Sequence, residues 1–196
     1  ESGKEEFVEV PEIVRFKNRI IELGEPKVGR IYGLAATGFG GSLMVIEVES
    51  MPGRGNLKMT GGLQKTIKES IITALDYLRA NYEKYGIEKN YFNSHDIHFQ
   101  AVELSIPKEG PSAGITSATV LLSAATARKI KSDLAMTGEI TIHGEVLPVG
   151  GISEKATAAY ENGIKTIIVP KKNKIDVEKL SKEILNKIDF IFVEHI

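Results

Sequence analysis

A serine and a lysine lie at two expected helix starts, where side chains of these types could perform nucleophilic chemistry. Ser112 lies in the segment Pro-Lys-Glu-Gly-Pro-Ser-Ala-Gly at 107–114, and Lys155 follows a glycine pair in 150–155. A helix start offers backbone N–H groups and a dipole that favours developing negative charge. A lysine held near that positive end, out of water, loses its proton more easily. The two segments predict a Ser/Lys dyad, with the serine as nucleophile and the amine as base.

The residues around Ser112 suit an acyl-transfer site. Gly110 and Pro111 fix the loop, while Ala113 and Gly114 leave room for a substrate carbonyl beside the hydroxyl. We expect the backbone N–H groups of this turn to form an oxyanion hole, a feature that lowers a barrier by about 3 to 4 kcal/mol. The alternative is a serine that only caps a helix, and the motif taken alone favours that alternative.

Lys155 can act as a base only if its pKa lies far below the ordinary value. That value is about 10.4, so general-base work near neutral pH needs a depression of about 3 units. Burial between Ile152, Ala156 and the expected sheet could supply part of this depression. The alternative is a solvent-exposed helix lysine, as we expect for most lysines of this chain.

Composition bounds the class of protein. The chain has 196 residues, 42% hydrophobic and 26% charged, which fits one globular domain with a sizeable core. The net charge of -1 gives no reason to expect a nucleic-acid partner. The sequence has no cysteine, which excludes thiolate nucleophiles, and no phosphate-binding loop of the G-x-x-x-x-G-K-[ST] type. Its first residue is Glu1 rather than Met, so we expect a piece of a longer protein.

Apolar periodicity predicts alternating strands and helices. Strands are expected over 28–36, 42–49, 97–104, 134–136, 166–169 and 190–193, with a hairpin over 140–147. Helices are expected over 62–85, 112–127, 151–160 and 177–186. In the second strand Val45, Glu47 and Glu49 alternate with apolar residues, which predicts one wet face. The order of elements predicts an α/β (α+β) fold, a single domain with mixed β-sheets and packed helices.

The serine and lysine segments, and the stretch between them, resemble the proteolytic domain of Lon, the ATP-dependent serine protease. The resemblance is carried by 107–114, by Met-Thr-Gly-Glu-Ile-Thr at 136–141, by Gly-Glu-Val-Leu-Pro-Val-Gly-Gly at 144–151, by Glu-Lys-Ala at 154–156, by 163–170, and by Tyr-Gly-Leu-Ala at 32–35. It implies a Lon-type proteolytic domain over 26–196. Residues 1–25 would then be a linker or helix towards an ATPase domain outside this chain.

The resemblance implies roles for four side chains and a serine endopeptidase activity. Ser112 matches the nucleophile of the family and Lys155 its catalytic lysine, which outweighs the capping and surface alternatives. Thr137 matches the threonine whose hydroxyl can orient the lysine amine. Glu109 stands where the family most often has aspartate. It could pair with the lysine in a resting state or shape the loop over the site.

The resemblance also implies partners beyond this domain. It predicts an AAA+ ATPase in the same full-length protein, with ATP and Mg²⁺ bound there, and a hexameric ring that degrades misfolded and short-lived regulatory proteins. No cofactor or metal is expected in this domain. The expected location is cytoplasmic. Membrane anchoring through a segment absent here stays open, because 25–30 resembles the membrane-anchored archaeal branch while 110–114 resembles the soluble bacterial branch.

One other catalytic mechanism and two other functions stay open from the sequence. Ser112, His98 and Asp96 could form a Ser/His/Asp triad, whereas the H-E-x-x-H spacing of a zinc site is missing. The chain could be a relative kept for assembly or regulation, although such a relative would be expected to lose the serine or the lysine. A phosphotransferase on a related scaffold should show a phosphate-binding glycine loop and metal-binding acids, and neither pattern is convincing.

Overall fold

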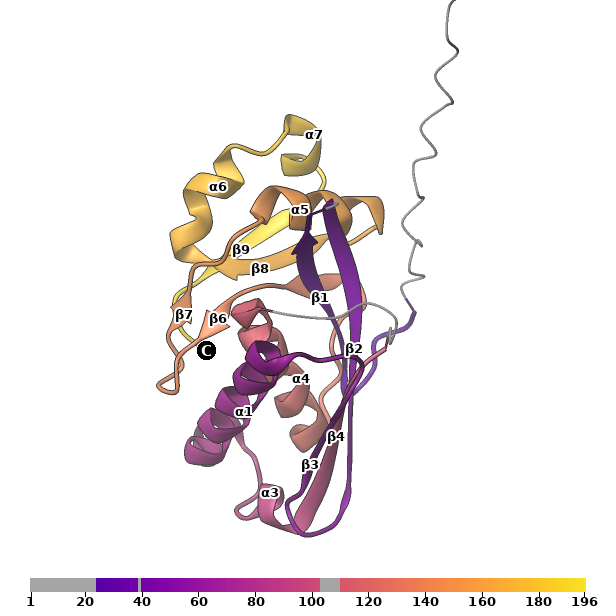
Figure 1. The fold of residues 1–196 in the computed structure, drawn as a ribbon, viewed down its shortest axis with the longest axis vertical. Helices are drawn as coiled ribbons and strands as arrows, with labels where there is room; N and C mark the ends of the chain where they lie inside the picture. Colours follow the sequence, from indigo (N-terminus) through magenta and orange to yellow (C-terminus); the bar gives the residue numbers. More distant parts are fainter. Residues whose placement is uncertain (1–23, 39, 103–109) are drawn as a thin grey trace, which may run out of the picture.

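A seven-stranded mixed sheet forms the centre of the molecule (Figure 1), in the order β3-β4-β2-β1-β5-β8-β9. The structure is a computed structural model that describes residues 24–38, 40–102 and 110–196. The strands are β1 (Arg30–Thr37), β2 (Gly40–Pro52), β3 (Leu57–Thr60), β4 (His95–Ala101), β5 (Leu134–Met136), β8 (Thr166–Pro170) and β9 (Asp189–Val193). A separate small sheet pairs β6 (Glu139–Ile140) with β7 (Val146–Leu147). The α/β fold expected from the sequence is confirmed.

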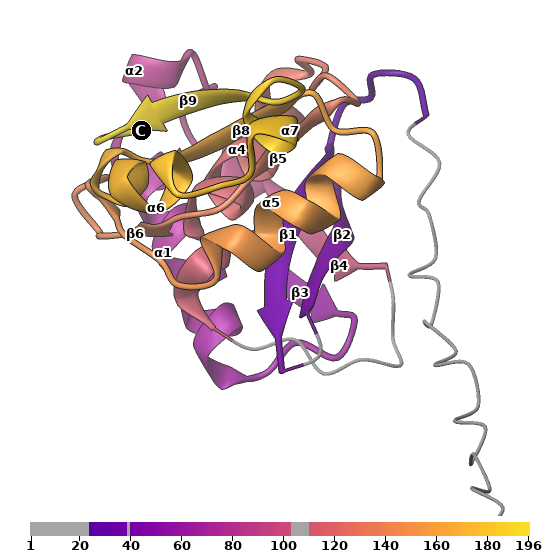
Figure 2. The ribbon, with the colours of Figure 1, turned by 90° about the horizontal axis from the view of Figure 1, so that it is seen from above.

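Helices cover both faces of this sheet (Figures 1 and 2). The longer ones are α1 and α4 on one face and α5 on the other, with α6 and α7 beside α5. The helices are α1 (Lys65–Ala80), α2 (Tyr82–Tyr85), α3 (Tyr91–Ser94), α4 (Gly114–Thr126), α5 (Ile152–Glu161), α6 (Lys174–Glu178) and α7 (Lys182–Leu185), with 3-10 turns η1 (Pro111–Ala113) and η2 (Lys171–Asn173).

The two faces of the sheet bury two separate hydrophobic cores. Successive residues of β1 point to opposite faces, so Ile31 belongs to the core under α1 and α4, while Tyr32 belongs to the core under α5. Val45 on β2 is only 8% exposed and lies in the second core. The wet face expected for this strand is therefore wrong at Val45, because α5 packs across that part of β2.

The arrangement of β1 and β5 determines where a ligand can bind. The two strands run parallel, and their pairing ends at Gly33 opposite Met136. Beyond that pair, β1 continues to Thr37 and stays paired with β2 on its other side. In open α/β sheets, ligands bind in the crevice outside the carboxyl ends of parallel strands. A site is therefore expected past Gly33 and Met136, between the two helical layers.

Three elements differ from the sequence-based prediction. β3 was not expected, because its four residues follow a glycine-rich turn without a clear alternation of apolar and polar side chains. The helix expected over 62–85 breaks at Asn81, whose backbone is not helical, so α2 is a separate turn. The helix expected over 177–186 is two short helices. Ser181 takes an extended backbone conformation and caps α7 by accepting a hydrogen bond from Ile184 N.

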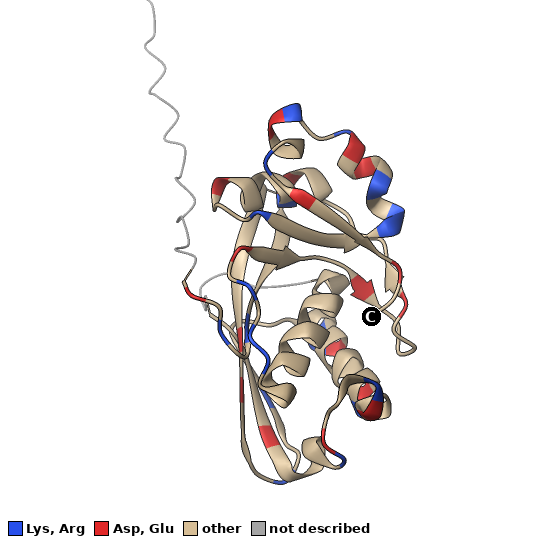
Figure 3. Ribbon diagram, turned by 180° about the vertical axis from the view of Figure 1, so that it is seen from behind, with Lys and Arg blue, Asp and Glu red and all other residues tan. Residues whose placement is uncertain are grey.

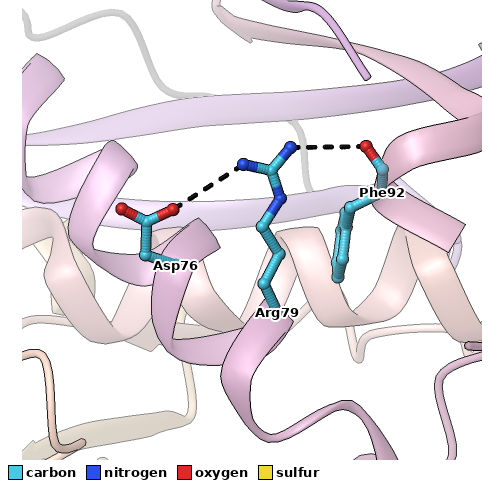
Figure 4. Close-up of polar contacts among 3 residues, drawn as sticks. All are labelled: Asp76, Arg79 and Phe92. Atoms are coloured by element: carbon cyan, nitrogen blue, oxygen red, sulfur yellow. Dashed lines mark hydrogen bonds and ion pairs between the residues drawn. The ribbon is translucent and has the colours of Figure 1, made fainter. Parts of the chain in front are cut away.

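A polar contact joins the end of α1 to α3 (Figure 4). Arg79 Nη1 lies 3.7 Å from Asp76 Oδ1, and Arg79 Nη2 donates to the Phe92 carbonyl at 3.3 Å. The Phe92 side chain is buried in the core under α1. The connection 86–94, expected to be merely polar, thus contains a short helix that contributes to that core.

Charges of both signs are spread over the surface that the structure describes (Figure 3). On α6, blue and red segments lie side by side, and Lys174 Nζ approaches Glu178 Oε1 to 3.9 Å. Every helix within the described ranges is too short or too polar to cross a lipid bilayer.

Candidate active site

Ser112 lies in a single 3-10 turn, Pro111–Ala113, that leads directly into α4. Proline suits the first position of a helical turn, because its φ angle is already fixed near the helical value and its missing N–H needs no partner there. The amide of Gly114 donates to the Pro111 carbonyl and closes the turn. Ser112 itself is partly exposed, so a substrate can reach its side chain.

The backbone of Ser112 is anchored to the segment between β5 and β6. Gly138 N donates to the Ser112 carbonyl at 2.8 Å, and Thr137 Oγ1 donates to the same carbonyl at 3.5 Å. A Cβ on Gly114 would lie 2.7 Å from Ile140 N, closer than real Cβ contacts allow. Glycine at this position therefore lets α4 begin directly against β6. These contacts hold the main chain of the serine turn and leave the hydroxyl accessible.

Lys155 lies in the first turn of α5 and is almost fully buried, with 4% of its surface exposed. Its Nζ donates to the carbonyl of Gly150 at 2.8 Å. Burial lowers the pKa of Lys155 from 10.5 to about 8, while the neighbouring Glu154 carboxylate acts in the opposite direction. At pH 8 about half of these amines are neutral, which is the state that a general base requires.

Two glycines bring the start of α5 onto the β1–β2 hairpin. A Cβ on Gly41 would lie 1.9 Å from the carbonyl oxygen of Glu154, and a Cβ on Gly151 would lie 2.4 Å from Ala36 Cβ. Gly151 also has a φ of 70°, a conformation that favours glycine. This close approach of helix and strands limits water at the first turn of α5 and contributes to the burial of Lys155.

Ser112 and Lys155 line one cavity of about 570 Å³ beyond the paired ends of β1 and β5. Leu34, Leu43 and Met44 make part of its wall apolar. Among the described residues that line it, the ionisable side chains are Glu139 and Lys155. The remaining wall comes from 33–37 of β1, 42–44 of β2, Ile67, the serine turn 110–113, Thr116 and the loop 148–150.

The predicted loop residues differ in what they can supply. Gly110 has a φ of 106°, which favours glycine and turns the chain into the 3-10 turn. Pro111 has no N–H, so it shapes the loop but cannot donate to an oxyanion. Ala113 is buried and has a backbone N–H that can donate to an oxyanion. Glu109, expected near the lysine, lies outside the described residues. The same holds for most of the predicted linker, residues 1–23.

The predicted dyad residues share the cavity but are not hydrogen-bonded to each other within the part of the chain that the structure describes. The amine of Lys155 is engaged by the Gly150 carbonyl. Thr137 is 1% exposed, and its hydroxyl donates to the backbone of Ser112. Its contact is thus with the serine turn, whereas the sequence led us to expect it at the lysine amine.

His98 and Asp96, the other members of the alternative triad, lie away from this cavity. His98 Nε2 is 2.9 Å from Thr60 Oγ1, and His98 lines a different, smaller cavity. The Asp96 carboxylate accepts a hydrogen bond from Asn56 N at 2.8 Å and holds the turn between β2 and β3. Neither side chain lines the cavity that contains Ser112. Within the described ranges, no three His, Cys, Asp or Glu side chains gather where they could hold a metal ion.

Comparison with known sequences shows the family. The family described as "Lon protease (S16) C-terminal proteolytic domain" matches residues 4–196. The chain belongs to this Lon family. It is 46% identical to Lon protease of Clostridium acetobutylicum and to Lon protease 1 of Thermus thermophilus, over 88% of this chain in each case. It is 47% identical to Lon protease of Heliobacterium modesticaldum over 93% of this chain.

Membership of the Lon family makes this domain a peptidase of the serine type and confirms the resemblance noted in the sequence. It also decides against the phosphotransferase alternative. The chain spans only about a fifth of these relatives, since the matched region is 22% of the length of each Lon protease.

Sequence reasoning missed two residues near the Lon-type site. Glu139 lines the cavity, and the motif around Thr137 contained it without indicating a role. Asn173 is 3% exposed and makes two hydrogen bonds to the backbone of Val149. It lies in the short basic run 171–174, whose composition predicts a solvated loop, so no sequence signal marked it as buried.

Proposed function

We propose that this domain cleaves peptide bonds through a Ser112–Lys155 dyad and is the endopeptidase part of an ATP-dependent Lon protease. The observation that carries the proposal is that an accessible serine and a buried lysine line one cavity. A buried amine with a pKa of about 8 can take a proton near neutral pH, which an exposed lysine cannot.

In the proposed reaction, Ser112 Oγ attacks the carbonyl carbon of the scissile bond and its proton passes to the neutral Nζ of Lys155. The tetrahedral oxyanion receives hydrogen bonds from the backbone of the serine turn, for which Ala113 supplies an N–H. The ammonium of Lys155 then protonates the leaving amine. Water attacks the acyl-enzyme with Lys155 again acting as base, and Ser112 is restored.

The first step requires a change at the lysine. Its amine donates to Gly150 in this structure, and in the charged form it has no lone pair. Loss of one proton frees a lone pair that can accept the proton of Ser112 Oγ, while another N–H keeps the hydrogen bond to Gly150. Glu109 would act on this step by pairing with the lysine or by shaping the loop, as the family resemblance implies.

We propose that the substrate binds in this cavity as an extended peptide. β5 pairs with β1 only as far as Gly33, and within the described residues no strand pairs with the same edge over 34–36. An extended substrate could add to this edge through main-chain hydrogen bonds, which gives affinity without a strict sequence requirement. The side chains of Leu34, Leu43 and Met44 would receive an apolar substrate side chain.

The wider function that we propose is supported by membership of the Lon family. The proposed full-length protein carries an AAA+ ATPase in the same chain, uses ATP and Mg²⁺ there, and assembles as a hexamer. It degrades misfolded and short-lived regulatory proteins in the cytoplasm or at a membrane to which another segment anchors it. Its partners are protein substrates rather than nucleic acids.

Hydrolysis of a fluorogenic peptide and of an unfolded protein tests the dyad, with the parent measured beside Ser112→Ala and Lys155→Ala. Both substitutions should abolish cleavage without unfolding the domain, as checked by thermal denaturation. Matched controls are Ser153→Ala and Lys179→Ala, which remove exposed side chains near the start of α5 and should retain activity.

Cleavage that survives Lys155→Ala would refute the mechanism in which the lysine is the base. A parent domain without activity would be measured again within the full-length protein and ATP. If the full-length protein is also inactive, the alternative of a relative kept for assembly or regulation holds.

A further inference from the structure

Asn173 is a buried amide that pairs with the backbone of the loop leading into α5. Its Oδ1 accepts from Val149 N at 3.0 Å and its Nδ2 donates to the Val149 carbonyl at 2.9 Å. The same Nδ2 donates to Asp176 Oδ2 at 2.8 Å. The side chain thus imitates a neighbouring strand and satisfies both polar groups of Val149.

These three contacts fix which way the amide points. Reversing the amide would place its oxygen against the Val149 carbonyl and the Asp176 carboxylate, where only acceptors are present. It would also set its NH₂ group against the N–H of Val149. The Asp176 carboxylate therefore locks Asn173 in the orientation that binds the loop.

The bound loop carries the acceptor of the lysine. Gly150 follows Val149 directly, and its carbonyl accepts from Lys155 Nζ at 2.8 Å. Pro148 and Gly150 are exposed, and a Cβ on Gly150 would meet no atom within 4 Å. Val149 packs against the core under α5, and the paired hydrogen bonds of Asn173 fix the backbone of the loop between these two exposed residues.

We propose that Asn173, oriented by Asp176, is a positioning residue for Lys155, acting through Val149 and the Gly150 carbonyl. The inference rests on the proposed role of Lys155 as the base. Asn173 does not touch the reacting atoms. It keeps the loop 148–150 closed over the amine, so that Nζ stays out of water and close to the cavity.

The charged groups around Lys155 and its burial determine how its pKa should change when the loop 148–150 loosens. Glu154 lies beside it on α5, Glu139 lines the same cavity from β6, and Asp176 and Lys179 lie near the loop from the α6 side. Burial is the largest cause of the low pKa of Lys155. Water entering past a loosened loop should therefore raise that pKa towards the ordinary value.

The test is the pH dependence of kcat and KM for peptide hydrolysis by the parent and Asn173→Ala. We expect the midpoint of the kcat profile to rise by about 1 pH unit, with KM little changed. If the midpoint moves from about 8 to about 9, the neutral fraction of the amine at pH 7 falls about tenfold, and kcat should fall with it. At high pH the two enzymes should converge.

The matched control is Asn162→Ala, which removes another buried amide that donates to a carbonyl of α5, Ala158, at the opposite end of the helix. It should lower thermal stability by a similar amount and leave the midpoint unchanged. A loss of activity in Asn173→Ala that is the same at every pH would mean a purely structural role and would overturn the proposal.

Asp176→Ala gives a second variant at an exposed position, which keeps the proposal testable if Asn173→Ala fails to fold. The carboxylate that raises the pKa of Lys155 is that of Glu154, so Asp176→Ala should act on this pKa by releasing Asn173, which raises it. A midpoint that rises therefore supports positioning, and one that falls or stays contradicts it.

Titration of the ¹³Cε signal of Lys155 by NMR separates this inference from the dyad. A raised pKa in Asn173→Ala and Asp176→Ala, together with cleavage that survives Lys155→Ala, would leave the positioning true and the base assignment false. An unchanged Lys155 titration in both variants would refute the positioning whatever the fate of the dyad.

Discussion

The two helix starts that carry Ser112 and Lys155 are alike in sequence but treat their side chains in opposite ways. Each follows a glycine, Gly110 in one case and Gly151 in the other, in a positive-φ conformation. At the first start the main chain is fixed and the serine side chain remains partly exposed. At the second the lysine is 4% exposed and loses most of its contact with water. A nucleophile must be accessible to the substrate, whereas a lysine amine must be shielded from water so that its pKa falls and it can act as a base.

The sharpest test of that difference is Lys155→Met, which keeps a long apolar side chain and removes the amine. Cleavage should fall by about 1,000-fold, because no neutral amine remains to take the serine proton. Peptide hydrolysis measures this effect, and Lys179→Ala serves as the control for loss of an exposed lysine. Retention of more than about a tenth of the activity would contradict the contrast drawn between the two helix starts.

The same variant should stabilise the domain, by an amount that depends on pH. The pKa of Lys155 is lowered on folding, from 10.5 to about 8, so the unfolded state binds more protons between these values. Below pH 8 this lowered pKa reduces the free energy of unfolding of the parent by about 3 kcal/mol, because one pKa unit corresponds to about 1.4 kcal/mol. This reduction disappears as pH rises from 8 towards 10.5, and it is absent from Lys155→Met at every pH.

Urea denaturation of both proteins at pH 7 and pH 10 measures this linkage. The gap in the free energy of unfolding should be largest at pH 7 and should shrink at pH 10. A gap that is equal at the two pH values would mean that burial does not disfavour the charged form of Lys155 at pH 7.

A substitution at Gly41 should affect the start of α5, which carries Lys155, and leave the serine turn unchanged. Gly41→Ala places a methyl group against the Glu154 carbonyl and should push α5 away, which costs about 2 to 3 kcal/mol of stability. Gly38→Ala in the same hairpin connection is the control, since its methyl group would meet no atom within 4 Å. Thermal denaturation compares them. Equal stability of the two variants would show that the contact is not tight.

The smallest effect is expected at Thr137, on the serine side. Thr137→Val removes the hydroxyl that donates to the Ser112 carbonyl and should lower kcat by about 5-fold, in line with a weak hydrogen bond of about 1 kcal/mol. Thr137→Ser keeps the hydroxyl and should restore most of the activity. If Thr137→Val instead shifts the pH midpoint, the hydroxyl acts on Lys155, as the family resemblance led us to expect.

The sequence predicted the residues of the Lon-type site but not their geometry. Ser112 and Lys155 were predicted because their segments resemble the Lon family, since the serine motif taken alone favours a helix cap. The close approach at Gly41 could not be predicted, because it depends on how α5 lies across β2. Asn173 was hidden for a similar reason, since its partners are backbone atoms of a loop 24 residues away.

The fold was also predicted only in part. For long periodic segments such as 62–85 and the β1–β2 hairpin, the type of element was predicted correctly, with errors at the ends. β3 and the break before Ser181 were missed, because short elements are decided by capping and pairing rather than by periodicity. The burial of Val45 was missed because a strand pattern cannot indicate that a second layer covers it.

The two cores on opposite faces of the sheet have a consequence for the newly made chain. The serine turn belongs to the layer of α1 and α4, and Lys155 to the layer of α5. Neither layer alone contains both groups, and the loop over the amine needs Asn173, which emerges from the ribosome later still. Under the proposed dyad, cleavage should therefore begin only once the chain has been made through Asn173 and both layers have folded.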